Sequence, residues 1–190
     1  VGGFGSVTTN KVIASVASDL FGLYAQAFPK YGSEKKGLPT NYYLTLAGEP
    51  IRLHAELNTV DFVAIQDQNA FLSGDPLVGL QPGGIIYLQS NQPADKVWAS
   101  LPGAARKTIR ERKLRLFALD AQRIAKESSS RMDLQVRMQG IVLMGAFLRL
   151  TPFGERAGLD EEHLFSSLEK TLTKYFGKRG GQVVADNLAA

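Results

Sequence analysis

Two short segments near the start of the chain contain the residues best suited to bind an anionic ligand. The first is the glycine-rich turn of residues 1–5, VGGFG. It leads into a run of hydroxyl groups and one cation, formed by Ser6, Thr8, Thr9 and Lys11. A glycine turn at the start of a helix offers unpaired N–H groups and the positive end of the helix dipole, and both favour phosphate. The second segment is a predicted surface loop over 29–39 that contains Lys30, Lys35 and Lys36. Together the two segments predict a site for a polyanionic ligand.

The glycine turn does not complete the sequence pattern of a dinucleotide-binding site. That pattern, G-x-G-x-x-G/A, needs glycine or alanine where this chain has Thr8, and an acidic residue about 20 residues later. Residues 24–27 read YAQA in that region. The Gly-Lys-Ser/Thr sequence of a Walker A loop does not follow Gly5 at the required interval either. A stand-alone NAD(P)-binding enzyme stays open as an alternative, with an incomplete fingerprint against it.

No group of residues in the sequence predicts catalysis by this chain. It contains no cysteine, so it cannot hold an iron–sulfur cluster through thiolates. Its two histidines, His54 and His163, are far apart and argue against a zinc site, and neither has the neighbours of a catalytic triad. The aspartates that follow or begin predicted strands are interpreted as caps or turn residues: Asp61, Asp67 and Asp120. We therefore predict no catalytic residue and no metal site, with any redox metal carried elsewhere.

The pattern of apolar residues indicates strands that alternate with helices. Helical spacing begins after the glycine turn and ends at Gly22, and a hairpin is predicted from 42–46 and 51–54. Continuous apolar runs predict buried parallel strands at 61–65 and 85–88, and a further strand at 114–120. Helices are predicted over 104–113, 121–126, about 134–147, and a last one capped by Asp160 and ended by Gly177. The predicted fold is α/β: a Rossmann-like open sheet, mostly parallel, with helices on both faces and an inserted hairpin.

Length and charge limit the class of protein. A chain of 190 residues with 44% hydrophobic and 21% charged residues predicts one globular domain over 1–190. The net charge of +4 suits an anionic small ligand or an acidic neighbour better than a nucleic-acid duplex. No membrane span and no signal peptide is predicted. Because a glycine turn of this kind normally follows a strand, we expect a short apolar strand before Val1 in the complete polypeptide.

Several short sequence segments, in order along nearly the whole chain, resemble those of a known family. They are residues 2–5 with 10–11, residues 24–37 (YAQAFPKYGSEKKG), 82–86, 96–102, 116–125 and 174–180. Together they resemble the gamma subunit or domain of the 2-oxoacid:ferredoxin oxidoreductases, and the pyruvate branch of that family in particular.

The resemblance implies a non-catalytic gamma component of a cytoplasmic, anaerobic complex. Such a complex oxidatively decarboxylates a 2-oxoacid such as pyruvate to an acyl-CoA and reduces ferredoxin. Thiamine diphosphate, Mg and the iron–sulfur clusters are implied on partner subunits or domains, while part of the CoA site is implied here. Carried over by position, the implied CoA-binding residues are Ser6, Asn10, Lys11, Ser33, Lys35 and Lys36. A purely structural assembly module is the other alternative, and no nucleic acid is expected as a partner.

Overall fold

The computed structural model describes residues 6–30, 41–129 and 132–190. Its centre is a three-stranded parallel sheet in the order β3-β4-β5. These strands are β3 (Val60–Ile65), β4 (Leu80–Gln89) and β5 (Arg115–Leu119). A separate antiparallel pair is formed by β1 (Tyr24–Lys30) and β2 (Asn41–Ala47). The predicted α/β class and the parallel strands are therefore confirmed.

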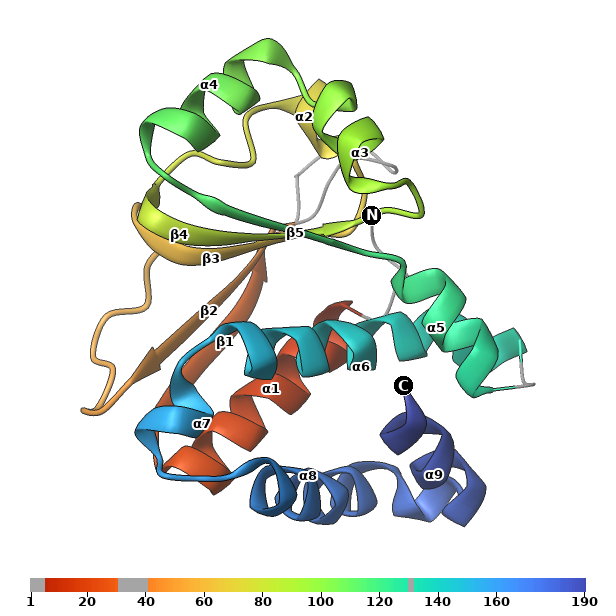
Figure 1. The fold of residues 1–190 in the computed structure, drawn as a ribbon. Coiled ribbons are helices and arrows are strands. Elements are labelled where there is room, and N and C mark those ends of the chain that lie inside the picture. The colour runs from red at the N-terminus through yellow and green to blue at the C-terminus, as the bar shows by residue number, and fades with distance from the viewer. Residues whose placement is uncertain (1–5, 31–40, 130–131) are drawn as a thin grey trace.

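Helices cover both faces of the parallel sheet, as Figure 1 shows. One face is covered by α2 (Ala70–Ser73), α3 (Ala94–Ser100) and α4 (Gly103–Glu111). The buried residues on this side come only from residues 65–114, with Leu80, Ile86 and Leu88 of β4 at their centre. All three of these side chains are almost fully excluded from solvent. This side of the sheet therefore has its own apolar core, built from a contiguous stretch of sequence.

The opposite face of the sheet packs against α1 (Ser6–Phe21) and α6 (Met132–Leu150). Phe62 of β3 contacts Phe147 of α6 edge to face, with ring centroids 5.2 Å apart. Four consecutive residues of α6, 141–144, are buried, which is the pattern of a helix enclosed on most sides. The outer elements on this side are α5 (Ala121–Ser128), α7 (Phe153–Arg156), α8 (Glu161–Phe176), the 3-10 turn η1 (Gly177–Arg179) and α9 (Gly181–Ala189). None of the helices in the described ranges is long and apolar enough to cross a membrane.

The hairpin exists, and its predicted strand 42–46 is confirmed within β2, but the predicted second strand, 51–54, is wrong. Residues 41–47 pair with 24–30 across the loop between them, whereas 51–57 has no regular structure. Side chains hold this segment beside β1 instead: Gln26 Nε2 lies 2.6 Å from His54 Nδ1, and Lys30 Nζ donates to Glu56 at 2.7 Å. The hydrogen bond to Glu56 raises the pKa of the Lys30 ammonium. Leu53 is 80% exposed, so the apolar residues of 51–54 do not share a buried face as a strand would require.

One predicted helix cap and one predicted turn residue are confirmed here. The Asp160 carboxylate accepts a hydrogen bond from the backbone N–H of His163 at 2.8 Å at the start of α8. This backbone hydrogen bond, together with one from the His163 ring, lowers the pKa of the Asp160 carboxyl. Asp67 accepts from the N–H of Asn69 at 2.9 Å, which is the expected turn role. Asp61 differs from the prediction, because it lies inside β3 with its side chain exposed.

Candidate functional site

The carboxyl ends of the three parallel strands form a polar edge. The chain leaves β3 towards Asp67, β4 at Ser90 and β5 at Asp120. In open α/β sheets, ligands bind in the crevice outside the carboxyl ends of the strands. This edge is therefore where the fold itself favours a ligand, and we call it the carboxyl edge.

Gln89 ties two strands together at the carboxyl edge. Its side-chain oxygen accepts a hydrogen bond from the N–H of Ala121 at 2.8 Å, and its Nε2 faces Asp120 Oδ1 at 3.4 Å. Gln89 is 8% exposed, so these bonds satisfy an amide that is largely removed from water. The last residue of β4 thus fixes the turn that connects β5 to α5.

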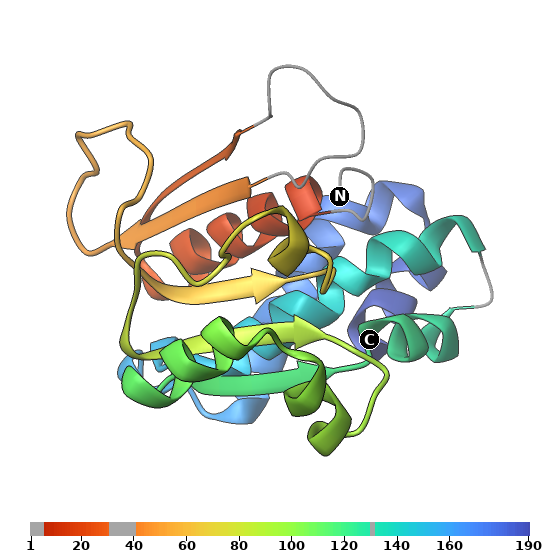
Figure 2. The same cartoon turned by 90° about the horizontal axis from the view of Figure 1, so that it is seen from above.

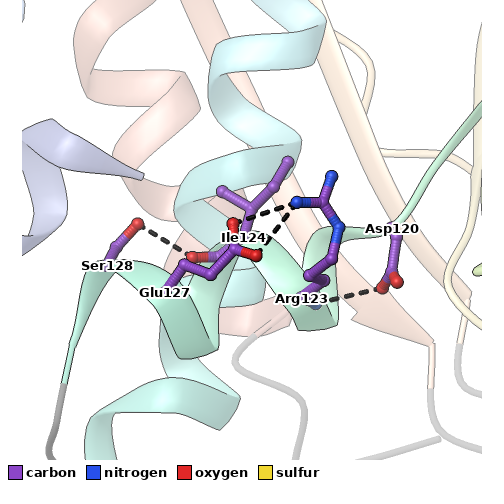
Figure 3. A network of polar contacts seen from close by, with 5 residues as sticks. All are labelled: Asp120, Arg123, Ile124, Glu127 and Ser128. Carbon is purple, nitrogen blue, oxygen red and sulfur yellow. Dashed lines mark hydrogen bonds and ion pairs between the residues drawn. The ribbon is translucent and has the colours of Figure 1, made fainter.

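Asp120 continues this arrangement as the N-cap of α5 (Figure 3). Its Oδ1 accepts from the backbone N–H of Arg123 at 3.0 Å. One turn further, Arg123 Nη1 contacts both carboxylate oxygens of Glu127 at 3.0 Å, and Ser128 Oγ donates to the carbonyl of Ile124 at 2.8 Å. The Arg123–Glu127 pair is solvent-exposed and adds little stability. The cap is therefore the contact that anchors the helix at this edge.

Two buried side-chain polar atoms, one in a turn and one on the sheet, have no hydrogen-bond partner within the part of the chain that the structure describes. They are Gln68 Nε2, in the turn after β3, and the hydroxyl of Tyr87 in β4. Burial, together with the nearby negative charge of Asp120, raises the pKa of Tyr87 to about 12. Neither residue, nor Gln89, was predicted from the sequence. The only available signal was a polar residue inside or directly after a strongly apolar run.

The start of α1 approaches the same end of the molecule. A 16-residue helix rises about 24 Å and a 7-residue strand spans about 23 Å, so β1 returns along the full length of α1. The Lys30–Asn41 end of the β1–β2 pair consequently lies near the first turn of α1, as Figure 2 shows. The loop that leaves this end belongs to the second predicted cationic segment. The described backbone thus places the end of the β1–β2 pair, which flanks the second predicted segment, near the first turn of α1.

The first turn of α1 contains no acidic residue. Its N–H groups and helix dipole are therefore available to an anion without competition from a neighbouring carboxylate. Lys11 is exposed and Asn10 is half-buried. Ser6 begins the helix, but its side chain lies outside the described part of the structure, as do residues 31–40 with Ser33, Lys35 and Lys36. The complete set of six predicted CoA-binding residues stays a prediction.

The two histidines have local structural roles. His54 contacts Gln26, and the Nδ1 of His163 lies 2.7 Å from Asp160, the cap of its own helix. No group of three or more His, Cys, Asp or Glu side chains that could hold a metal ion occurs among the described residues. The start of α1 offers backbone N–H groups and the exposed positive charge of Lys11, which suit a phosphate-bearing molecule, whereas the carboxyl edge carries the carboxylates of Asp67 and Asp120.

Comparisons with known proteins give a consistent result. The family model described as pyruvate ferredoxin/flavodoxin oxidoreductase matches residues 1–190. A pyruvate:ferredoxin oxidoreductase from Moorella thermoacetica is 27% identical over 190 residues, which are 100% of this chain and 15% of that protein. The chain spans about 15% of the length of the first curated relatives that it matches.

Two solved structures share the fold. The pyruvate oxidoreductase subunit PORC from Thermotoga maritima has a TM-score of 0.69 at 22% identity, covering 98% of this chain and 86% of that one. A 2-oxoglutarate:ferredoxin oxidoreductase from Magnetococcus marinus, solved with 2-oxoglutarate, coenzyme A and succinyl-CoA bound, has a TM-score of 0.59 at 20% identity. The match covers 98% of this chain and 27% of that one.

Proposed function

The chain belongs to the pyruvate ferredoxin/flavodoxin oxidoreductase family, and from this we propose that it is the gamma component of a 2-oxoacid:ferredoxin oxidoreductase complex. The proposed complex oxidatively decarboxylates a 2-oxoacid such as pyruvate to an acyl-CoA and passes the electrons to ferredoxin. The observation that carries the proposal is the family match over residues 1–190. It favours this function over a stand-alone NAD(P)-binding enzyme, whose glycine fingerprint is incomplete at Thr8, and over a module without a ligand.

The chemistry of the side chains decides which groups this chain can hold. Iron–sulfur clusters need thiolate ligands, and the chain has no cysteine, so the clusters do not fit here. We assign the clusters, thiamine diphosphate and Mg to partner subunits or domains. CoA fits better, because its phosphates require N–H donors and cations, and the start of α1 supplies the former and Lys11 the latter. When bound, CoA supplies the thiol that receives the acyl group.

Within this proposal the chain acts by binding and orientation. Ser6, Asn10 and Lys11 are placed at the phosphate end of CoA from α1. Ser33, Lys35 and Lys36 are placed at the rim of the same site from the loop that joins β1 to β2. The nearness of the Lys30–Asn41 end of the strand pair to the first turn of α1 supports one shared site. The 2-oxoacid is assigned to other chains.

The test is CoA kinetics of the complete oxidoreductase that contains this chain. Replacing Lys35 and Lys36 together with alanine is expected to raise the KM for CoA by about five- to tenfold, and Lys11→Ala by about two- to fivefold. The effect should be larger at low salt, because exposed charges are screened by ions. The KM for the 2-oxoacid should stay unchanged. Lys170→Ala, an exposed lysine on α8, is the matched control. An unchanged KM for CoA in the double variant would show that the two lysines are only a solvated surface.

A further inference from the structure

The positive charge of this protein is concentrated on one helix and the turn that follows it. Residues 106–115 contain six basic residues and one acidic residue, whereas the whole chain has a net charge of only +4. The rest of the chain is therefore slightly acidic. On α4, Gly103, Arg106, Lys107, Arg110 and Glu111 line an open depression of about 510 Å³. We call this surface the basic depression.

The cations at the basic depression are not neutralised by the rest of the protein. Lys107 and Glu111 are 3.8 Å apart in an exposed pair on the same helix, which contributes little. Arg106 forms no ion pair with any residue in the described ranges, and neither does Lys113 just beyond the helix. The positive potential of this surface is therefore directed towards solvent.

Contacts of Arg110 with α3 and of Arg112 with β4 fix the basic depression and the turn that follows it. The guanidinium of Arg110 stacks on Trp98 of α3, 5.1 Å from the ring centroid. Arg112 Nη1 donates to the carbonyl of Leu80 at 2.8 Å, and the carbonyl of Arg112 accepts from the N–H of Gly83 at 2.8 Å. Leu80 begins β4, so this turn is fixed at the amino ends of the strands. The 10-residue β4 separates it from the carboxyl edge by about 30 Å.

The composition of the surface indicates the kind of contact it makes. The exposed large apolar side chains among the described residues are Tyr24, Leu53, Leu72, Val78, Met132 and Phe165, and none lies between 103 and 115. Permanent subunit interfaces are more apolar than this. Exposed charges instead raise the rate of encounter and suit a partner that binds and leaves. Glu111 inside the depression also opposes a continuous row of nucleic-acid phosphates.

We propose that the basic depression steers and docks an acidic electron-acceptor protein, ferredoxin, onto the complex. This rests on the proposed function, because an acceptor must bind, take electrons and leave in every turnover. The chain has no cysteine and supplies no redox centre through thiolates, so α4 contributes only to encounter and orientation while electrons come from a neighbouring subunit.

The experiment uses the complete oxidoreductase with a ferredoxin of net negative charge as the probe. The variant Arg106→Glu/Lys107→Glu reverses two charges in the basic depression. The control Lys170→Glu/Lys178→Glu makes the same change in net charge on α8 and η1, on the opposite side of the molecule (Figure 1). At about 20 mM salt we expect the KM for ferredoxin to rise at least about fivefold in the variant and less than about twofold in the control. The difference should disappear near 0.5 M salt, where the Debye length is only a few ångströms.

Reduction of a small viologen dye by the 2-oxoacid and CoA separates the two proposals. The variant is expected to reduce the dye at the wild-type rate, which also shows that it is folded and assembled. Normal dye reduction with an unchanged KM for ferredoxin, or an equal rise in the control, would overturn the docking surface alone. A wild-type complex that cannot reduce the dye with CoA present would overturn the proposed function instead.

Discussion

At the scale of single residues, Tyr87 is the least expected feature of the core. Its side chain is fully buried, yet its hydroxyl has no hydrogen-bond partner among the described residues. A buried unpaired donor costs about 1–3 kcal/mol. We therefore expect Tyr87→Phe to leave the free energy of unfolding at pH 8 unchanged or to increase it, as measured by urea unfolding of the full chain.

The same residue predicts how stability depends on pH. Tyrosine ionises near pH 10 in the unfolded chain, while burial holds the pKa of Tyr87 at about 12 in the fold. Above pH 10 ionisation of this tyrosine lowers the free energy of the unfolded state, while the side chain stays protonated in the folded state. The free energy of unfolding therefore falls between pH 10 and about 12. The loss amounts to about 3 kcal/mol. Tyr87→Phe should remove this part of the loss, whereas Tyr24→Phe, at a half-exposed position, should not. Equal alkaline losses in wild type and Tyr87→Phe would contradict the assignment.

At the scale of secondary-structure elements, the cap of α5 controls the carboxyl edge. Asp120→Ala removes the acceptor of the Arg123 N–H and the neighbour of Gln89, and we expect it to lower the free energy of unfolding by about 1 kcal/mol. Asp120→Asn keeps an oxygen in the same place and should stay within a few tenths of the wild type. Denaturant titration of the three proteins measures the difference, and equal destabilisation by alanine and asparagine would contradict a capping role.

The elements that could be predicted from the sequence are those whose signals are local. Short apolar runs, such as 85–88, predict the parallel strands. Acidic residues directly before helical spacing predict the caps at Asp120 and Asp160. The pairing of β1 with β2 could not be predicted in this way. It joins residues on either side of the loop 31–40, and Pro29 within β1 is a residue that normally argues against a strand.

In the candidate site, too, only the features with a local sequence signal could be predicted. A glycine turn before a helix is visible in the sequence, and so are clustered lysines. The roles of Gln68, Tyr87 and Gln89 depend on which strands become neighbours and on how deeply each side chain is buried. Register and burial are properties of the assembled sheet, so no local pattern in the sequence reports them.

At the scale of the whole molecule, the proposed division of labour predicts what the separate chain does. The purified chain alone is expected to bind no iron and to show no 2-oxoacid-dependent dye reduction, because it lacks thiolate ligands and an acid–base group suited to the reaction. The complete complex, assayed in parallel, should show both. Iron analysis and dye assays on the two preparations measure this, and substantial turnover by the chain alone would contradict a non-catalytic role.

The apolar cores on the two faces of the parallel sheet have different consequences for how the chain reaches this structure. The fully buried residues of the core between the sheet and α3 and α4 lie within 65–114, and the partly buried residues packed against them extend this only to 60–116, so its contacts close short loops. The core under the other face joins Val12 and Val16 of α1 to Leu168 and Leu172 of α8, and must close a loop of about 150 residues. Contacts between residues close in sequence form sooner. Folding is therefore expected to start with the β3-β4-β5 unit, and α1 takes its place last.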